Sequence, residues 1–225
     1  MNTVDQSIEL FYEEKGEKSP LILLHGNGES HEYFAGQVEE FSKHFRVIAL
    51  DTRGHGKSPR GTAPFSIAQF AEDLHDFMLK KSILRASLLG FSDGGNTALT
   101  FALKYPEMVE QLILNGANLC PAGVKRRYQI PIEIDYHFSK LLGGKSTETL
   151  ALMVNEPNIR PEELQKIKCR TLVIVGTKDM ITPQHSKLIF QSLPNAEFAE
   201  IRGSHFVAHE NPNEFNRAVL KFLGK

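Results

Sequence analysis

A serine near the middle of the chain lies in a setting that could make it a nucleophile. Residues 90–94 read Gly-Phe-Ser-Asp-Gly, a G-x-S-x-G pattern centred on Ser92. The pattern follows an apolar run typical of a buried strand and precedes a stretch with helical periodicity. In such a turn the glycines permit close backbone approach and the serine hydroxyl is held above the sheet. Ser92 is therefore a candidate nucleophile, and the alternative for this position is a helix N-cap.

An acid and a base follow along the chain in the order that this chemistry requires. Asp179 comes after the apolar run 171–175, and His205 comes after a predicted strand over 197–201. An unassisted serine hydroxyl is a poor nucleophile, so a histidine must accept its proton while an acid fixes the tautomer of the ring. We expect Ser92, Asp179 and His205 to form a catalytic triad.

Backbone N–H groups beside this triad could stabilise a developing oxyanion. Residues 25–28 read His-Gly-Asn-Gly directly after the first buried strand. A loop at this place can direct the N–H of Asn27 towards the site, and the N–H of Asp93 follows the candidate nucleophile. Loss of one such donor typically lowers the rate by about 10²- to 10³-fold. Asn27 and Asp93 are the predicted oxyanion-hole residues.

A further motif completes a resemblance to a known family. Residues 51–58 read Asp-Thr-Arg-Gly-His-Gly-Lys-Ser after the second buried strand. Together with the motifs above, in this order, they make nearly the whole chain resemble the α/β-hydrolase superfamily. The resemblance implies a mostly parallel sheet flanked by helices and hydrolysis through an acyl-enzyme on Ser92, with no metal or organic cofactor. It also implies that Asp51, Arg53 and His55 shape a turn.

The elements that must position these residues alternate between strands and helices. Short apolar runs bounded by Gly, Asp or Asn alternate with amphipathic stretches, which is typical of βαβ units and a parallel sheet. Ligands of such sheets bind beyond the carboxyl ends of the strands. The buried strands are expected at 21–24, 47–50, 86–89, 112–114 and 171–175, and helices at 67–79, 94–106, 184–193 and 212–223.

The alternation breaks between residues 118 and 167, which predicts a small inserted cap. We expect a hydrolase core of 1–117 and 168–225 and a cap of 118–167, with weakly amphipathic pieces at 136–142 and 147–153. All 225 residues then fit one compact domain with an insertion. A cap this small predicts a fairly open pocket.

Two groups of side chains are candidates for the substrate pocket. Three aromatic residues near the motifs could line it, although aromatic side chains at such places also belong to cores. Arg126 and Arg127, in a cluster with Lys125, could meet a substrate carboxylate or form a solvated face. The aromatic candidates are Tyr33, Phe34 and Phe91.

Composition restricts the partners and the location. With 26 basic and 27 acidic residues the net charge is −1, so no global field attracts nucleic acid or an anionic membrane. The apolar runs are too short to span a bilayer, and Met1–Leu10 has no signal-peptide pattern. Two cysteines, Cys120 and Cys169, form no disulfide framework and are expected as reduced core thiols. We expect a cytoplasmic protein, monomeric or dimeric, with a small-molecule substrate.

The reaction itself is left open by the motifs. A carboxylesterase acting on a small or medium acyl group is the first hypothesis, and an enol-lactonase or C–C bond hydrolase of aromatic or quinone metabolism is the second. A ligand-binding receptor built on a hydrolase scaffold is the alternative from another class. A zinc site at His205 and His209 is disfavoured, because Phe206 replaces the glutamate that such a motif needs.

Overall fold

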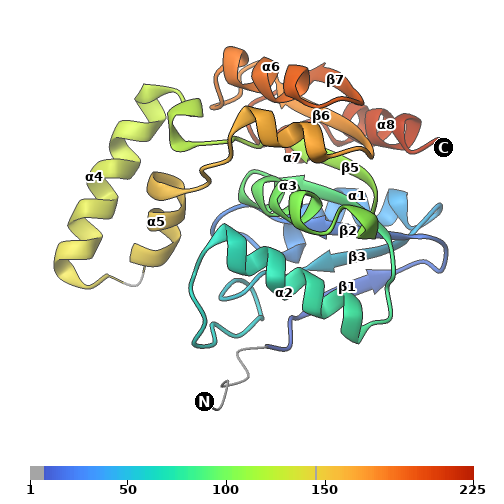
Figure 1. The fold of residues 1–225 in the computed structure, drawn as a ribbon, viewed down its shortest axis with the longest axis horizontal. Coiled ribbons are helices and arrows are strands. Elements are labelled where there is room, and N and C mark those ends of the chain that lie inside the picture. The colour runs from blue at the N-terminus through green and yellow to red at the C-terminus, as the bar shows by residue number, and fades with distance from the viewer. Residues whose placement is uncertain (1–7, 145) are drawn as a thin grey trace.

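A seven-stranded, mostly parallel sheet organises the chain. The computed structural model describes residues 8–144 and 146–225, and Figure 1 shows the sheet with helices on both faces. The strand order is β1-β3-β2-β4-β5-β6-β7. The strands are β1 (Tyr12–Lys15), β2 (Pro20–Leu24), β3 (Arg46–Leu50), β4 (Ala86–Phe91), β5 (Val109–Asn115), β6 (Arg170–Gly176) and β7 (Ala196–Ile201).

Six of these strands are parallel and correspond to the predicted ones. Their registers are regular, for example Leu21 opposite Val47 and Leu23 opposite Leu89. Strand β1, which pairs antiparallel with β3 at the sheet edge, was not predicted. Its side chains are mostly exposed and its sequence is Tyr-Glu-Glu-Lys, so no apolar alternation marks it as a strand. The predicted fold class is confirmed.

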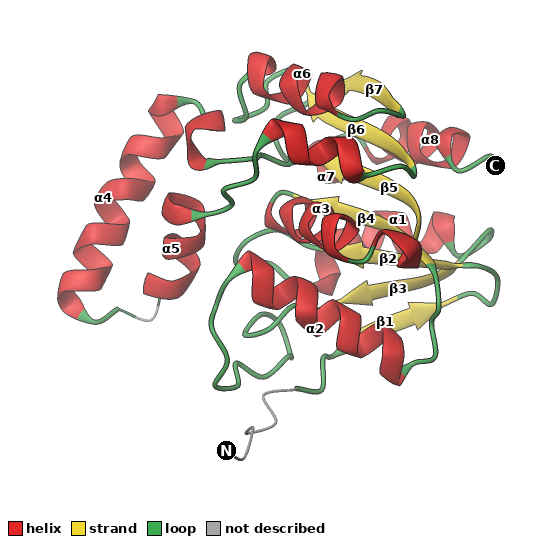
Figure 2. Cartoon of the chain, viewed as in Figure 1, coloured by secondary structure: helices red, strands yellow, loops and turns green. Residues whose placement is uncertain are grey.

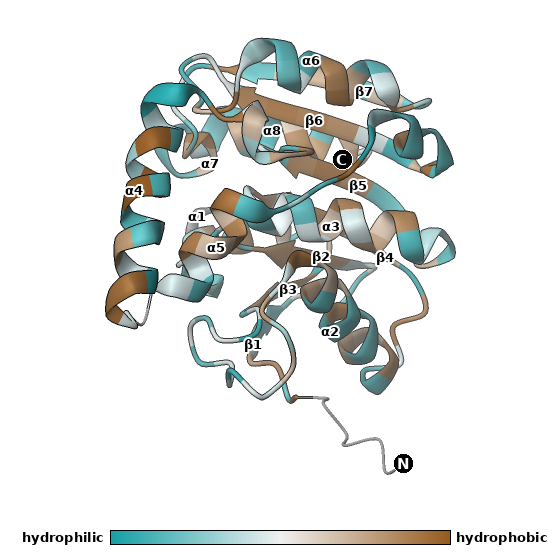
Figure 3. Cartoon of the chain, turned by 60° about the vertical axis from the view of Figure 1, so that its left-hand side comes forward, coloured by the Kyte–Doolittle hydropathy of each residue, from teal (hydrophilic) through white to brown (hydrophobic). Residues whose placement is uncertain are grey.

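Two apolar layers cover the two faces of the sheet. Alternate strand residues point to opposite faces, so Ile22 and Leu24 belong to one core cluster while Leu21 and Leu23 belong to the other. The first cluster also contains residues of α2 and α3, and the second contains residues of α1 and α8. Figure 3 shows the apolar strands enclosed between these helices.

Helices α2, α3, α5, α6 and α8 begin and end close to the predicted places, whereas α7 had no predicted counterpart. Ser66 caps α2 by accepting the N–H of Gln69, as the sequence indicated. Helix α1 was not predicted. The helices are α1 (Ala35–Phe41), α2 (Ile67–Lys80), α3 (Asp93–Lys104), α4 (Arg126–Leu142), α5 (Thr147–Asn155), α6 (Pro183–Ser192), α7 (Val207–Glu210) and α8 (Pro212–Phe222).

Helices α4 and α5 form a hairpin that stands apart from the sheet. Figure 2 shows the hairpin on the side where the parallel strand arrows end, which is where the sequence places the candidate site. Helix α4 spans 17 residues and contains Pro131, so it is far longer than the piece predicted at 136–142. Residues 1–7 of the expected core segment 1–117 lie outside the described residues.

The helices and the cysteines bear on the expected absence of a membrane span and on the expected core thiols. In the described ranges no helix is both long and apolar enough to cross a membrane. Cys120 and Cys169 are both free, and both are partly exposed rather than fully buried.

Candidate active site

The backbone at Ser92 has the strained geometry of a tight strand-to-helix turn. Ser92 lies between β4 and α3 with a φ of 52°, a value that is uncommon for a residue with a side chain. A Cβ at Gly90 would lie 2.2 Å from the carbonyl oxygen of Gly94, and one at Gly94 would lie 2.1 Å from that of Leu24. Only glycine fits at these two positions. The Ser92 side chain makes no capping hydrogen bond, which rules out the N-cap alternative in this structure.

A hydrogen-bonded chain joins the three predicted triad residues. The Oγ of Ser92 lies 3.0 Å from Nε2 of His205, and Nδ1 of His205 lies 2.7 Å from Oδ1 of Asp179. Asp179 and His205 are buried. Gly116, with a φ of 62°, passes so close that a Cβ there would lie 2.6 Å from the imidazole. The arrangement allows His205 to take a proton from Ser92 while Asp179 holds the ring in one tautomer.

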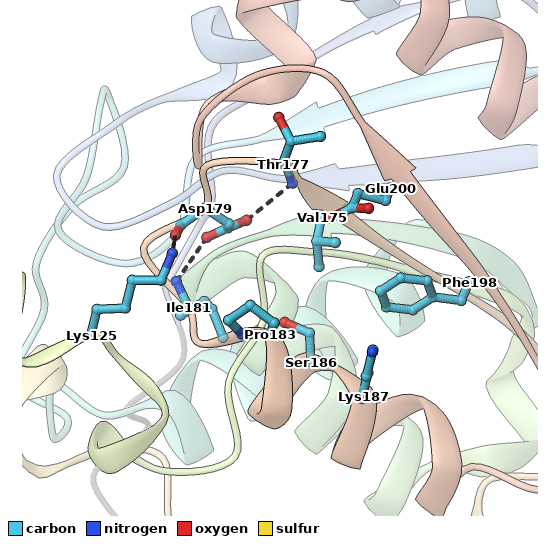
Figure 4. Close-up of a pocket in the computed structure, with 11 residues that line it drawn as sticks. Lys125, Val175, Thr177, Asp179, Ile181, Pro183, Ser186, Lys187, Phe198 and Glu200 are labelled. Carbon is cyan, nitrogen blue, oxygen red and sulfur yellow. Dashed lines mark hydrogen bonds between the residues drawn. The ribbon is translucent and has the colours of Figure 1, made fainter.

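Asp179 is held as a carboxylate acceptor by its loop. Burial alone would raise its pKa, but hydrogen bonds from His205 and from the N–H groups of Ile181 and Gly176 outweigh burial and keep the pKa below its ordinary value. Figure 4 views this residue from a neighbouring cavity, where Nζ of Lys125 donates to the Asp179 carbonyl oxygen at 2.5 Å. Lys125 therefore joins the loop of the acid to the start of α4.

The loop that carries Asn27 is fixed by two polar side chains. Nδ2 of Asn27 donates to Oδ2 of Asp93 at 2.7 Å and to the Thr149 carbonyl on α5 at 2.9 Å. Nδ1 of His25 bonds the Gly26 carbonyl at 2.7 Å, and its Nε2 accepts the Thr52 N–H. Burial lowers the pKa of His25 to about 4, so its ring is neutral. The two predicted oxyanion-hole residues are thus hydrogen-bonded to each other.

Glu29 is a half-buried acid in this loop that was not predicted from the sequence. Its Oε2 accepts the N–H of Gly26 at 3.0 Å. Burial raises its pKa to about 7, against the lowering effects of this hydrogen bond and of His205. A carboxyl group with this pKa changes its charge near neutral pH, close to the candidate base.

We expect Glu29→Gln to stabilise the protein at and above neutral pH. The unfolded carboxyl ionises near pH 4.5, whereas the folded one keeps its proton up to about pH 7. Between these values the folded state binds more protons, so the free energy of unfolding of the wild type falls as pH rises. With allowance for partial exposure, that loss is about 1–2 kcal/mol. Urea unfolding across this window should give a flatter pH dependence for Glu29→Gln, and parallel curves would contradict the assignment.

A small cavity opens at Ser92, and most of its lining was not predicted. Gln129 of α4 and Met153 of α5 reach it from the hairpin, and Asn118 reaches it from the segment after β5. No sequence pattern predicts that these residues line the cavity, because their distance from Ser92 depends on how α4 and α5 pack. The Ser92 pocket is lined by Ser92, Asp93, Asn118, Val124, Gln129, Met153, Glu156, Met180, Ile181 and His205.

The structure does not bring the predicted pocket residues into this lining. Arg126 is exposed and pairs with Glu133 at 3.1 Å, and Arg127 is exposed beside Tyr128. Within the basic cluster, Lys125 lines the neighbouring cavity and donates to the Asp179 carbonyl oxygen. The aromatic candidates pack in or against the core: Phe34 and Phe91 are buried, and the half-buried Tyr33 stacks on Phe91 with ring centroids 4.4 Å apart. None of these five residues lines the Ser92 cavity, and their contact with substrate stays a prediction.

The pocket is acidic. Burial raises the pKa of Asp93, although hydrogen bonds from Asn27 and Asn96 act in the opposite direction. Burial also raises the pKa of Glu156, and the charge of Asp93 raises it further. Neither Lys nor Arg is among the lining residues. Two carboxyl groups whose ionisation is disfavoured by burial therefore line the same cavity as the candidate nucleophile.

The 51–58 motif makes structural contacts, as the resemblance implied. Asp51 accepts the N–H groups of His31 and Lys57. Arg53 is fully buried and forms a bidentate pair with Asp73, at 2.7 and 2.6 Å. Among the described residues no group of three or more His, Cys, Asp or Glu could hold a metal ion.

Comparison with known proteins shows the family. The model of the α/β hydrolase fold matches residues 19–133, and the chain belongs to this family. The serine hydrolase BPHL of Mus musculus is 30% identical over 246 residues, covering 96% of this chain and 83% of the relative. The protein is thus a hydrolase of the α/β-hydrolase fold.

Two other matches indicate how far the similarity extends. The 2-hydroxy-6-oxo-6-(2'-aminophenyl)hexa-2,4-dienoic acid hydrolase of Metapseudomonas resinovorans is 26% identical, covering 97% of this chain and 88% of that protein. The crystal structure of a hydrolase from Pseudomonas aeruginosa PA01 superposes with a TM-score of 0.80 at 25% identity, covering 99% of this chain and 97% of that one. Both similarities run over almost the whole chain.

Proposed function

We propose that this protein is a serine hydrolase that cleaves a carboxylic ester of a small or medium acyl group. Ser92 attacks the carbonyl carbon, His205 accepts the Ser92 proton and returns it to the leaving alcohol, and water then hydrolyses the acyl-enzyme. Asp179 orients His205, and the N–H groups of Asn27 and Asp93 stabilise the oxyanion. The observation that carries the proposal is the hydrogen-bonded chain from Ser92 through His205 to Asp179.

The segment 118–167 acts as a small cap over this site in the proposal. Its helices supply Gln129 and Met153 to the Ser92 pocket, and Asn27 bonds the backbone of α5. A substrate must therefore pass between the hairpin and the carboxyl ends of the strands. The narrow cavity at Ser92 suits a small acyl group.

The acidic lining favours neutral or cationic substrates over carboxylates. A carboxylate placed beside Asp93 and Glu156 would disfavour their ionisation further in a partly desolvated pocket, whereas a protonated amine would favour it. The earlier expectation that Arg126 or Arg127 binds a substrate carboxylate has no geometric support, because both side chains are exposed and neither lines the pocket.

An ester panel tests both the reaction and the charge preference. Three p-nitrophenyl esters of equal length would end in a methyl group, a protonated amine or a carboxylate. We expect the carboxylate ester to give the lowest kcat/KM. Glu156→Gln should narrow the difference between amine and carboxylate esters by roughly tenfold, which corresponds to about 1.4 kcal/mol. Preference for the carboxylate ester would contradict the proposed pocket.

A C–C bond hydrolase is the second candidate, favoured by the 26% identity to the Metapseudomonas resinovorans dienoic acid hydrolase. A vinylogous diketone and a lactone belong in the same panel for this reason. Faster turnover of the diketone than of every ester would select this reaction. Tight ligand binding with negligible turnover of all members would instead favour a receptor.

A further inference from the structure

Most large apolar side chains of helix α4 point to solvent instead of towards the rest of the protein. The residues that face the rest of the protein include Gln129, which is 3% exposed, and Ser139, whose hydroxyl bonds that of Thr147 at 2.7 Å. The exposed fractions of the outward-facing apolar residues are 43% for Ile130, 60% for Ile134, 63% for Phe138, 80% for Leu141 and 70% for Leu142.

These five residues form one continuous surface, here called the α4 stripe. Their spacing of three and four residues aligns them along one side of the helix. More than half of the exposed large apolar side chains in residues 8–144 and 146–225 lie on α4, which Figure 3 shows at the outer edge of the molecule. The stripe amounts to several hundred Å² of apolar surface, and the largest patch on a typical monomer is about 300–600 Å².

The charges beside the stripe favour a protein partner over a membrane. Three basic residues, Arg126, Arg127 and Lys140, share the helix with two acidic ones, Glu133 and Asp135, so its polar face carries both signs. A helix that lies on anionic lipid carries a predominantly basic polar face, which α4 lacks. A partner for the stripe must present apolar side chains flanked by charges of both signs.

A second copy of this chain meets that requirement. In an antiparallel pairing about a two-fold axis near residue 136, Ile134 lies opposite the partner's Phe138, and Ile130 lies opposite the partner's Leu142. Glu133 and Lys140 are seven residues apart and lie along the same edge of the stripe. The same pairing brings Glu133 of each copy, which also pairs with Arg126 of its own helix, beside Lys140 of the partner subunit.

We propose that the α4 stripe is the interface of an antiparallel, two-fold symmetric dimer. Two stripes together with their flanks reach the size of about 1,000 Å² that a specific interface needs. The interface uses the outer side of α4, while Gln129 on the inner side lines the Ser92 pocket. The dimer therefore contacts the outer side of the α4–α5 hairpin and leaves the candidate site uncovered.

Sedimentation velocity of the full chain over a wide range of concentration tests this interface. We expect the wild type to be a dimer and Phe138→Glu to be a monomer with unchanged circular dichroism. Leu84→Glu is the matched control, because Leu84 is 83% exposed but far from α4 in the chain, and it should remain a dimer. A monomeric wild type at all concentrations would overturn the proposal, as would a Phe138→Glu dimer.

A charge exchange tests the antiparallel pairing itself. Glu133→Lys and Lys140→Glu should each raise the dimer dissociation constant by roughly tenfold, because each places like charges together. The double variant should recover most of the wild-type affinity, and failure to recover it would contradict the pairing. Co-sedimentation with phosphatidylcholine vesicles completes the test: a monomeric wild type that pellets with them would assign the stripe to lipid instead.

Discussion

Asp179→Asn should lower turnover by about 10⁴-fold while leaving the fold intact. The amide can still accept the N–H of Ile181, which lies 2.9 Å from Oδ1 in the wild type. It cannot supply the negative charge that stabilises a protonated His205, and it permits the tautomer in which Nε2 carries the proton and cannot accept one from Ser92. The expected loss thus lies in kcat rather than in substrate binding.

Steady-state kinetics on a p-nitrophenyl ester measure this loss, with thermal unfolding as the control for folding. Asp76→Asn provides a matched substitution, because Asp76 lies on α2 with a side chain that is 47% exposed. It should retain wild-type turnover. A value for Asp179→Asn within tenfold of the wild type would remove Asp179 from the proposed mechanism.

Arg53→Met should destabilise the protein by about 3–5 kcal/mol, because it leaves the Asp73 carboxylate buried without its partner. The Arg53 and Asp73 side chains are 0% and 3% exposed and are joined by two short hydrogen bonds. Water cannot replace the guanidinium at such a site. The pair links the 51–58 turn to α2, so the variant loses the ion pair that holds this turn against the helix.

Urea unfolding of Arg53→Met and Arg85→Met would separate burial from pairing as such. Arg85 pairs with Glu110 at 2.9 Å, but both side chains are more than half exposed. Its removal should cost less than about 1 kcal/mol. Equal losses for the two variants would show that burial of the Arg53 pair does not determine its contribution.

The motifs predicted which residues come together at the candidate site better than they predicted the lining of its pocket. Ser92, Asp179 and His205 each follow a strand of the parallel sheet, so strand order alone places them at one edge. The lining residues Gln129 and Met153 come from the α4–α5 hairpin instead. No periodicity in the sequence fixes where such a hairpin packs, and the aromatic residues chosen in its place belong to the core.

The length of helix α4 was underestimated for a related physical reason. Sequence periodicity assumes that apolar residues face the protein, but in α4 they face outwards and Pro131 interrupts the pattern. The same inversion is what the proposed dimer explains. Strand β1 was not predicted because its exposed, charged residues show no apolar alternation. It is a strand because it pairs with β3.

Labelling with a fluorophosphonate tests the central claim most directly, because this probe reacts preferentially with an activated serine. Intact mass and peptide mapping of the folded wild type should show a single adduct on Ser92. Ser92→Ala should remain unlabelled, and His205→Ala should react far more slowly. A folded wild type that stays unmodified, or that carries the adduct on a different serine, would contradict the proposed role of Ser92.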